Sequence, residues 1–372
     1  MLQVPDAALP EITAKVLSEE EIEWTLIDWA GIQRNASQLI GRGLVGEDEQ
    51  NALKIADRLE ALGFVVEWQS TRRHSDNRDE YDCDGDGHHE YGSNSHNSRP
   101  KFDWPDSPTV LALVPHWQCE QWLSRCLQSL VSQYYPLTNI VVIDDGSEAP
   151  PFEIVSAFPQ VTLLTAKVSQ PVGPYRLVQS VIERVDYTAF LFQDADDWSS
   201  CDRLQTLLTT ANRYGADLVG SQEIRVIEPT KMFQTVGYPM DVNAAMCSAP
   251  GHGLLHPTSL VTRRLVQRVG GFATGLRFGA DSEFLLRAHW MARVVNSPQY
   301  CYFRRKRPES LTTAKETGLD SLARKQLTQK IKEKALERAH AMKAGIPVDV
   351  RPLAIQPLID FSYVCGPILR WQ

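Results

Sequence analysis

The sequence predicts an α/β protein whose main domain is a parallel sheet with helices packed against it. Three observations support this prediction. Short apolar runs alternate with amphipathic stretches between residues 108 and 220, acidic residues directly follow two of those runs, and a polar stretch separates this region from the N-terminal segment. Strands that alternate with helices are typical of βαβ units with right-handed crossovers.

Residues 1–69 are expected to form a small helical unit. Apolar residues recur at helical spacing in residues 11–22, 23–40 and 47–62, and residues 64–68 are compatible with a short strand. We expect this unit to cover the main domain, with docking or dimerisation as the alternative role.

Residues 70–107 are predicted to be a flexible linker, because they contain almost no aliphatic side chain that could be buried. Asp82, Asp84, Asp86 and Gly87 match the first half of an EF-hand calcium loop. The twelfth position is Ser93, where that loop requires a glutamate. A solvated linker is therefore expected, and Ca²⁺ binding is the alternative.

The main domain begins with strands that are apolar throughout, as expected for strands buried on both faces of a parallel sheet. The predicted strands are residues 110–114, 140–143, 161–164, 189–193 and 218–220. The predicted helices are residues 120–133, 177–185, 202–214, 282–289 and 319–342. Residues 232–256 are expected to be a loop region, and the proline-containing tail 346–372 is expected to pack on the N-terminal helices, form a dimer surface or bind a partner.

Carboxylates follow two of these strands. Asp144 and Asp145 come after the second, and Asp194, Asp196 and Asp197 come after the fourth. Ligands of such sheets bind beyond the carboxyl ends of the strands. Three adjacent carboxylates repel one another unless a cation lies between them, and Mg²⁺ and Mn²⁺ prefer oxygen ligands. The alternative is an acidic turn in which Asp197 or Ser199 caps the next helix.

Charge and cysteine content argue against a nucleic-acid-binding protein and against a disulfide-bonded one. A net charge of −8 gives no electrostatic reason to expect nucleic acid as a partner. The seven cysteines include no C-x-x-C pair, which is typical of reduced thiols in a cytoplasmic protein. Neither a signal peptide nor a membrane span is indicated, so we expect a soluble, cytoplasmic protein.

The order of motifs resembles that of family 2 glycosyltransferases of the GT-A fold, over about residues 110–313. The motifs are Pro115 at the first strand, Asp144-Asp145-Gly146-Ser147, Asp194-Ala195-Asp196-Asp197, Gly270-Gly271-Phe272, Asp281-Ser282-Glu283-Phe284-Leu285-Leu286-Arg287 and Ser310-Leu311-Thr312. The resemblance implies a GT-A domain at residues 108–314 and a C-terminal extension at residues 315–372.

The resemblance also implies an inverting, metal-dependent glycosyltransferase of the hexosyltransferase type. Its donor would be a nucleotide-diphosphate sugar, most often a UDP-sugar, and its cofactor Mn²⁺ or Mg²⁺. The implied roles are nucleotide contact for Pro115 and His116, base recognition for Asp144 or Asp145, ribose or metal contact for Asp194, metal binding for Asp196, and general base for Asp281. The alternative for Asp281 is an N-cap of the helix at residues 282–289.

Three departures from the family pattern leave alternatives open. Ala280 stands where an acid usually precedes the base, so Glu283 is a second candidate. Gly173 and Arg176 replace a glycine-rich loop and are expected near the diphosphate or the base. The run Phe303-Arg304-Arg305-Lys306-Arg307 stands where many members have a metal-binding histidine. There Arg304 is expected to clamp the diphosphate, with a solvated basic loop as the equal alternative.

Two other functions remain to be weighed. A nucleotidyltransferase would need a glycine- and lysine-rich loop where Pro115-His116-Trp117 stands. A non-catalytic sugar-nucleotide-binding or partner-binding scaffold of the same fold is supported by Ala280 alone. The acceptor is left open between glycan, peptide and small molecule, and a homo-oligomer through the N-terminal helices or the C-terminal tail is one expected assembly.

Overall fold

The structure is a computed structural model. It describes residues 99–227, 232–248, 251–308, 310–315 and 317–372, together with the backbone of residues 14–16 and 22–24. The chain divides into two compact units, Met1–Arg99 and Pro100–Gln372. Residues 70–98 of the predicted linker, including the acidic run 82–87, lie outside the described residues. The prediction of a flexible linker is wrong for the residues that follow, because the Phe102 N–H donates to the Gly215 carbonyl at 2.9 Å and the Trp104 Nε1 atom donates to the Ala216 carbonyl at 3.0 Å.

In the N-terminal unit, β1 (Ala14–Val16) and β2 (Ile22–Trp24) form an antiparallel pair in which Val16 lies opposite Ile22. The prediction of helix is wrong at these residues. The sequences Ala-Lys-Val and Ile-Glu-Trp alternate apolar and polar side chains, a period of two that suits a strand.

The second unit is built on a mixed sheet with the strand order β12-β5-β4-β3-β6-β10-β8-β11-β7. Its parallel part contains β3 (Val110–His116), β4 (Asn139–Asp144), β5 (Val161–Ala166) and β6 (Ala189–Phe192). Each coincides with a predicted strand. Alternate residues of these strands enter different apolar cores: Leu111 and Leu113 lie in one and Ala112 and Val114 in the other.

The rest of the sheet contains both antiparallel and parallel pairs. The short β10 (Leu260–Thr262) is antiparallel to both β6 and β8 (Leu218–Ile227), so β8 runs in the same direction as β6. The long β11 (Val294–Lys306) is parallel to β8, and β7 (Trp198–Ser199) pairs antiparallel with β11. The carboxyl ends of β4, β3, β6, β8 and β11 therefore meet at one edge of the sheet.

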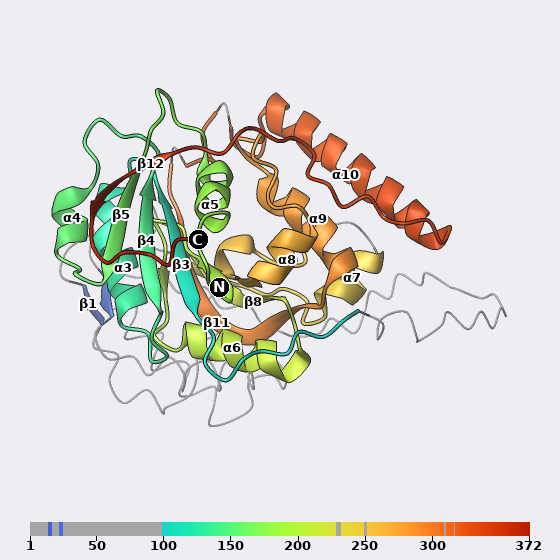
Figure 1. The fold of residues 1–372 in the computed structure, drawn as a ribbon, viewed down its shortest axis with the longest axis horizontal. Helices are drawn as coiled ribbons and strands as arrows, with labels where there is room; N and C mark the ends of the chain where they lie inside the picture. The colour runs from blue at the N-terminus through green and yellow to red at the C-terminus, as the bar shows by residue number, and fades with distance from the viewer. Residues whose placement is uncertain are drawn as a thin grey trace. The chain divides into compact units, whose positions relative to one another are not determined.

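Helices cover both faces of the sheet, as Figure 1 shows. On one face α3 (Glu120–Val131), α4 (Phe152–Ser156) and α6 (Arg203–Tyr214) bury their apolar sides. The other face is covered by α5 (Pro174–Ile182), α8 (Arg263–Arg268), α9 (Ala280–Met291) and α10 (Leu322–Lys343). The first turns of α5 and α9 carry residues of the predicted site.

One prediction about the later part of the chain is wrong, and for the tail a dimer surface or a partner-binding role stays a prediction. The expected loop region 232–256 contains β9 (Met232–Val236), which pairs with β8, and α7 (Val242–Ser248). The tail packs on its own sheet: β12 (Phe361–Cys365) pairs antiparallel with β5, and Ile359 and Leu369 are buried. Backbone pairing at the open edge of β5 stabilises this arrangement. Within the described residues, no helix is both long and apolar enough to cross a membrane.

Candidate active site

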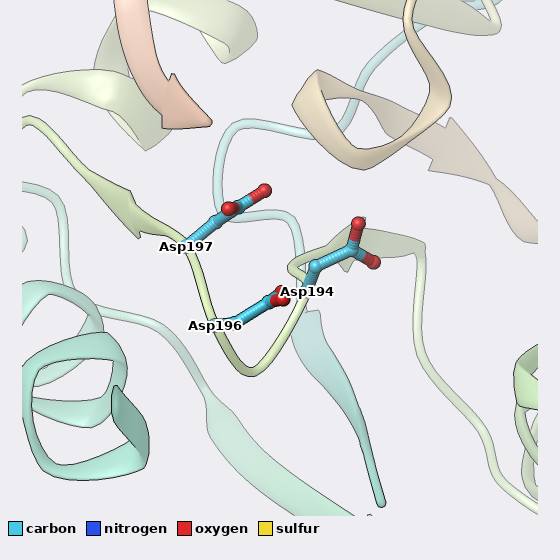
Figure 2. A group of neighbouring side chains, drawn as sticks. All are labelled: Asp194, Asp196 and Asp197. Atoms are coloured by element: carbon cyan, nitrogen blue, oxygen red, sulfur yellow. The ribbon is translucent and has the colours of Figure 1, made fainter. Parts of the chain in front are cut away.

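The acidic turn after β6 is the centre of the candidate site. Asp194, Asp196 and Asp197 each offer one carboxylate oxygen, and these atoms lie within 4.8 Å of one another. Figure 2 shows the three side chains on the turn. Burial raises the pKa of Asp194 to about 7, and the charge of Asp196 adds to this shift. Burial and the same neighbour also raise the pKa of Asp197 well above its ordinary value. The three carboxyl groups therefore resist being ionised together unless a cation offsets their repulsion.

The alternative of a helix-capping turn is wrong. The next helix, α6, begins at Arg203 with Asp202 as its N-cap residue, while residues 198–199 form β7. Neither Asp197 nor Ser199 therefore caps it. The acidic turn lies beside β11 because β7 pairs with that strand. Phe303 lies opposite Trp198, and the two rings stack 5.1 Å apart.

Basic residues of β11 and the loop after it contact the acidic turn directly. The Arg307 Nε atom donates to Asp196 Oδ2 at 2.8 Å, and the Arg305 backbone N–H donates to Asp197 Oδ1 at 2.6 Å. The Arg305 Nε atom also donates to the Asp196 carbonyl at 2.9 Å. The expectation of a solvated basic loop is thus wrong for residues 304–307, because pairing of β11 with β7 holds them against the carboxylates.

The carboxylates of this turn fit a divalent cation. Arg307 already neutralises Asp196, whereas no hydrogen bond from a described residue reaches the Asp194 carboxylate. A cation bound between Asp194 and Asp196 would offset the repulsion that raises the pKa of Asp194. Oxygen donors in this number and spacing suit Mg²⁺ or Mn²⁺, which need only one or two carboxylates when phosphates complete the shell.

The carboxylates at the end of β4 hold local structure. Asp144 lies 3.2 Å from His116 Nδ1 and accepts hydrogen bonds from the Ser147 hydroxyl and N–H. Burial would raise the pKa of Asp144, but these hydrogen bonds lower it below the ordinary value. Asp145 accepts the N–H groups of Val172 and Gly173, at 2.9 and 2.8 Å. Pro115 and His116 end β3 beside them, and recognition of a base by this group stays a prediction.

The start of α5 holds the predicted residues Gly173 and Arg176 and one residue, Tyr175, that the sequence analysis missed. Gly173 has φ of 93°, and a Cβ there would lie 3.1 Å from the Arg277 carbonyl oxygen, so glycine is required. The Arg176 Nε atom donates to the Pro357 carbonyl at 2.9 Å, which ties it to the C-terminal segment. Tyr175 was not predicted, and its pKa is raised by burial and by the charges of Asp281 and Asp194, so its hydroxyl lies near both.

Asp281 converges on the acidic turn from another element. It lies in the first turn of α9, whose N-cap residue is Gly279 in the left-handed region, so the N-cap alternative is wrong. The charge of Asp281 contributes to the raised pKa of Asp194. Asp281 is only half-buried, as a group that receives a proton from a ligand must be.

The second candidate base, Glu283, is engaged in contacts that hold the fold together. Its side chain is 2% exposed and pairs with Arg287 at 2.7 Å, and its Oε1 atom accepts the Leu353 N–H at 3.1 Å. Residues three or four positions apart share a helix face, whereas Glu283 is two positions after Asp281 and is buried in the core. We therefore retain Asp281 alone as the candidate base.

Arg203 is a second residue that the sequence did not reveal. Its fully buried guanidinium donates to Gln193 Oε1, Ser199 Oγ and the carbonyl oxygens of Phe192 and Pro257, at 2.7–2.8 Å. Burial lowers its pKa to about 10, so it remains charged at neutral pH. These bonds hold the junction between β6 and the acidic turn. In the sequence, an arginine at the start of an amphipathic helix reads as solvent-exposed.

The mixed sheet, its acidic carboxyl edge and the two-sided helical cover define an α/β domain with a candidate ligand site where its strands end. Residues 112–241 match the model of the family described as Glycosyl transferase family 2. The matching residues make up about a third of the chain.

Three curated relatives are glycosyltransferases by name. The chain is 26% identical to GlyA of Streptococcus pneumoniae over 125 residues, which cover 33% of this chain and 18% of GlyA. It is 25% identical to AglE of Haloferax volcanii over 198 residues, covering 51% of this chain and 62% of AglE. It is 25% identical to EpsJ of Bacillus subtilis over 239 residues, covering 60% and 69%. The match thus spans less than two thirds of GlyA and of AglE.

Solved structures with similar folds include those of TarS from S. aureus. Residues 1–349 of TarS in complex with UDP superimpose with a TM-score of 0.44 and 18% identity, over 63% of this chain and 72% of that one. The complex with UDP-GlcNAc gives a TM-score of 0.46 and 17% identity, over 63% and 73%.

Proposed function

We propose that this protein is an inverting glycosyltransferase that moves a sugar from a UDP-sugar to an acceptor hydroxyl with the help of Mn²⁺ or Mg²⁺. The observation that carries the proposal is the acidic turn after β6, where Asp194, Asp196 and Asp197 bring carboxylate oxygens within 4.8 Å of one another inside the segment that matches the glycosyltransferase family model. A structural role alone does not require this proximity.

In the proposed mechanism Asp281 acts as the base, the acidic turn holds the cation, and nearby arginines contact the phosphates. Asp281 accepts the proton of the acceptor hydroxyl on a carboxylate oxygen while the sugar carbon is attacked. When a divalent cation is bound at Asp194 and Asp196, it stabilises the negative charge of the departing diphosphate. Arg304 and Arg307 border the acidic turn, and their guanidinium groups are suited to donate hydrogen bonds to phosphate oxygens.

The scaffold alternative has little to support it. Ala280, the departure that favoured it, is fully buried at the start of α9. A carboxylate at this position would be desolvated at a cost of several kcal/mol unless it were paired. The absence of an acid there is thus accounted for by packing, and Asp281 keeps its position at the site.

The donor is tested by thermal denaturation of the full chain with UDP-, GDP- and ADP-sugars, each with and without Mn²⁺. We expect a UDP-sugar to raise the Tm only when Mn²⁺ is present, since a ligand that binds the folded state alone stabilises it by mass action. Hydrolysis of that donor should follow on longer incubation. A response to GDP-sugars alone would overturn the donor assignment, and binding without turnover over a broad acceptor panel would favour the scaffold.

Arg307 and a cation are expected to compete for Asp196. The two side chains pair at 2.8 Å and are 15% and 18% exposed. Loss of such a pair is worth about 1 kcal/mol, roughly a fivefold change in Kd. Arg307→Gln should therefore bind Mn²⁺ about fivefold more tightly without nucleotide, as measured by electron paramagnetic resonance titration.

The matched control for this measurement is Arg351→Gln, which breaks an exposed pair with Asp349. Its Kd for Mn²⁺ should equal that of the unaltered chain. Unchanged or weaker Mn²⁺ binding in Arg307→Gln would mean that Arg307 does not occupy the cation's place.

A further inference from the structure

An aromatic cluster connects the acidic turn with the first turn of α9. Its five rings have neighbouring centroids 4.2–5.9 Å apart and belong to Tyr175 of α5, Phe192 of β6, His256 of the short helix η1 (His256–Thr258), Phe272 between α8 and α9, and Phe284 of α9. Phe192 precedes Asp194 by two residues in the chain. Phe284 follows Asp281 by three positions, about one helical turn, so the two side chains share a face of α9. Both parts of the proposed site are therefore built on one cluster of rings.

Tyr175 is the member of this cluster that combines a polar group with access to a ligand. The rings of Phe192, Phe272 and Phe284 are buried, whereas Tyr175 is half-buried. Its ring packs 5.2 Å from that of Phe272 and 5.5 Å from that of His256, which holds it in place. No hydrogen bond from a described residue reaches its hydroxyl. A tyrosine hydroxyl that is partly withdrawn from water normally has a hydrogen-bond partner, so this one is suited to a ligand.

The charges around Tyr175 place its hydroxyl at the proposed site. Burial raises the pKa of Tyr175 well above its ordinary value, and the charges of Asp281 and Asp194 raise it further. The hydroxyl therefore stays protonated at neutral pH and can donate one hydrogen bond. Because such interactions act over a few ångströms, the hydroxyl lies close both to the proposed base and to the proposed cation site.

His256 is a second polar member of the cluster whose hydrogen-bonding capacity is not used within the described residues. Its Nε2 atom is buried and has no partner there, and its Nδ1 atom lies 3.5 Å from the Ser259 hydroxyl oxygen. That hydroxyl donates to the His256 carbonyl at 2.6 Å, so towards Nδ1 it can only accept. Burial lowers the pKa of His256 to about 4, so the ring is neutral at neutral pH. An unpaired buried nitrogen costs stability, and packing alone therefore does not account for a polar ring beside Tyr175.

The Tyr175 hydroxyl lies where the proposed reaction needs the transferred sugar. A cation at Asp194 and Asp196 would hold the diphosphate, and Asp281 would receive the proton of the acceptor hydroxyl. The sugar carbon that is attacked must lie between the diphosphate and the acceptor. A group close to both Asp194 and Asp281 is therefore placed to contact the sugar rather than the base of the nucleotide.

We propose that the Tyr175 hydroxyl donates a hydrogen bond to a hydroxyl group of the transferred sugar and so contributes to the choice of sugar. The inference rests on the proposed function and deepens it by naming a residue that determines donor specificity. A site built to hydrogen-bond one hydroxyl of a ligand strongly rejects the analogue that lacks it. The rings of His256 and Phe272 hold Tyr175 in position for this contact.

The test compares Tyr175→Phe with the unaltered full chain. The donors are the UDP-sugar that stabilises the chain and its monodeoxy analogues, and kcat/KM for donor consumption is measured with Mn²⁺ present. Tyr175→Phe should lower kcat/KM for the parent sugar by about tenfold, as expected for the loss of one hydrogen bond. The Kd for UDP should stay unchanged, because phenylalanine keeps the ring and loses only the hydroxyl. One deoxy analogue should show the same loss with the unaltered chain, and for that analogue Tyr175→Phe should cause no further loss.

The matched control is Tyr214→Phe, which removes the hydroxyl of an exposed tyrosine at the end of α6. It should consume every donor at the rate of the unaltered chain. Thermal denaturation of both variants without ligand shows whether either substitution disturbs the fold.

Two results would overturn this role of Tyr175. One is an equal kcat/KM of Tyr175→Phe and the unaltered chain for the parent sugar and for each deoxy analogue. The other is an equal loss of affinity for UDP and for the UDP-sugar, which would give Tyr175 a structural role. Failure of the proposed function looks different: the unaltered chain itself would bind and consume no nucleotide sugar, and the role of Tyr175 would fall with it. A response to GDP-sugars instead would change only the nucleotide, and the same comparison would be made with that donor.

Discussion

Asp196→Asn is expected to reduce sugar transfer by about a hundredfold to a thousandfold, the range measured when a group that stabilises transition-state charge is removed. The substitution removes one of the two carboxylates proposed to hold the cation, and it also removes the partner of Arg307. The Mn²⁺-dependent rise in Tm with a UDP-sugar should disappear as well. Both effects are measured on the same preparation, by donor consumption and by thermal denaturation.

Asp320→Asn is the control for this variant, because Asp320 is fully exposed and pairs only loosely with Lys325. It should transfer sugar at the rate of the unaltered chain. If Asp196→Asn kept full activity and full dependence on Mn²⁺, the cation would have to bind elsewhere and the proposed role of the acidic turn would be wrong.

Asp281→Asn is expected to lower kcat by about a hundredfold to ten thousandfold, since general-base catalysis contributes about that much. Asparagine preserves the size of the side chain but cannot accept the proton of the acceptor. Asp281 carries no capping hydrogen bond and is half-buried, so the fold should be unaffected. The measurement pairs kcat for transfer with the Kd for the UDP-sugar, which should stay within about twofold.

Glu283→Gln, two residues after Asp281 on the same helix, distinguishes a structural carboxylate from the proposed catalytic one. Removing this carboxylate leaves the fully buried Arg287 without its charge partner, which costs about 3–5 kcal/mol of unfolding free energy. Urea denaturation should show this loss, whereas Asp281→Asn should unfold like the unaltered chain. The opposite pattern, with a stable Glu283→Gln that has lost kcat, would make Glu283 the base.

The parallel half of the sheet was predictable because its strands are buried on both faces and therefore read as continuous apolar runs. The continuation of β8 beyond the predicted residues 218–220 was not predictable. Ser221, Gln222 and Glu223 are buried polar residues, and they do not resemble a strand in sequence. They are tolerated because other segments satisfy them: the amide of Gln222 donates to the Ser297 carbonyl, and Glu223 pairs with Arg225. Such compensation is invisible to a pattern of hydrophobicity.

The position of the candidate site followed from the sequence for a topological reason. Carboxylates that end parallel strands must lie at one edge, whatever the details of packing. The strand assignment alone was enough to predict this edge for Asp144, Asp145, Asp194 and Asp196. Asp281 depended on the order of motifs, and its approach to Asp194 became visible only once α9 was packed on the sheet.

The fold class and the acidic edge thus follow from local periodicity, because burial dictates the spacing at which apolar side chains recur along strands and helices. The charge state of that edge does not follow from local periodicity, since it depends on charged side chains that are remote along the chain. Arg307 reaches Asp196 across 111 residues, and Arg304 lies beside Arg225 only because β11 pairs with β8. Electrostatic interactions act over a few ångströms in space, so the pairing of strands had to be known before they could be assigned.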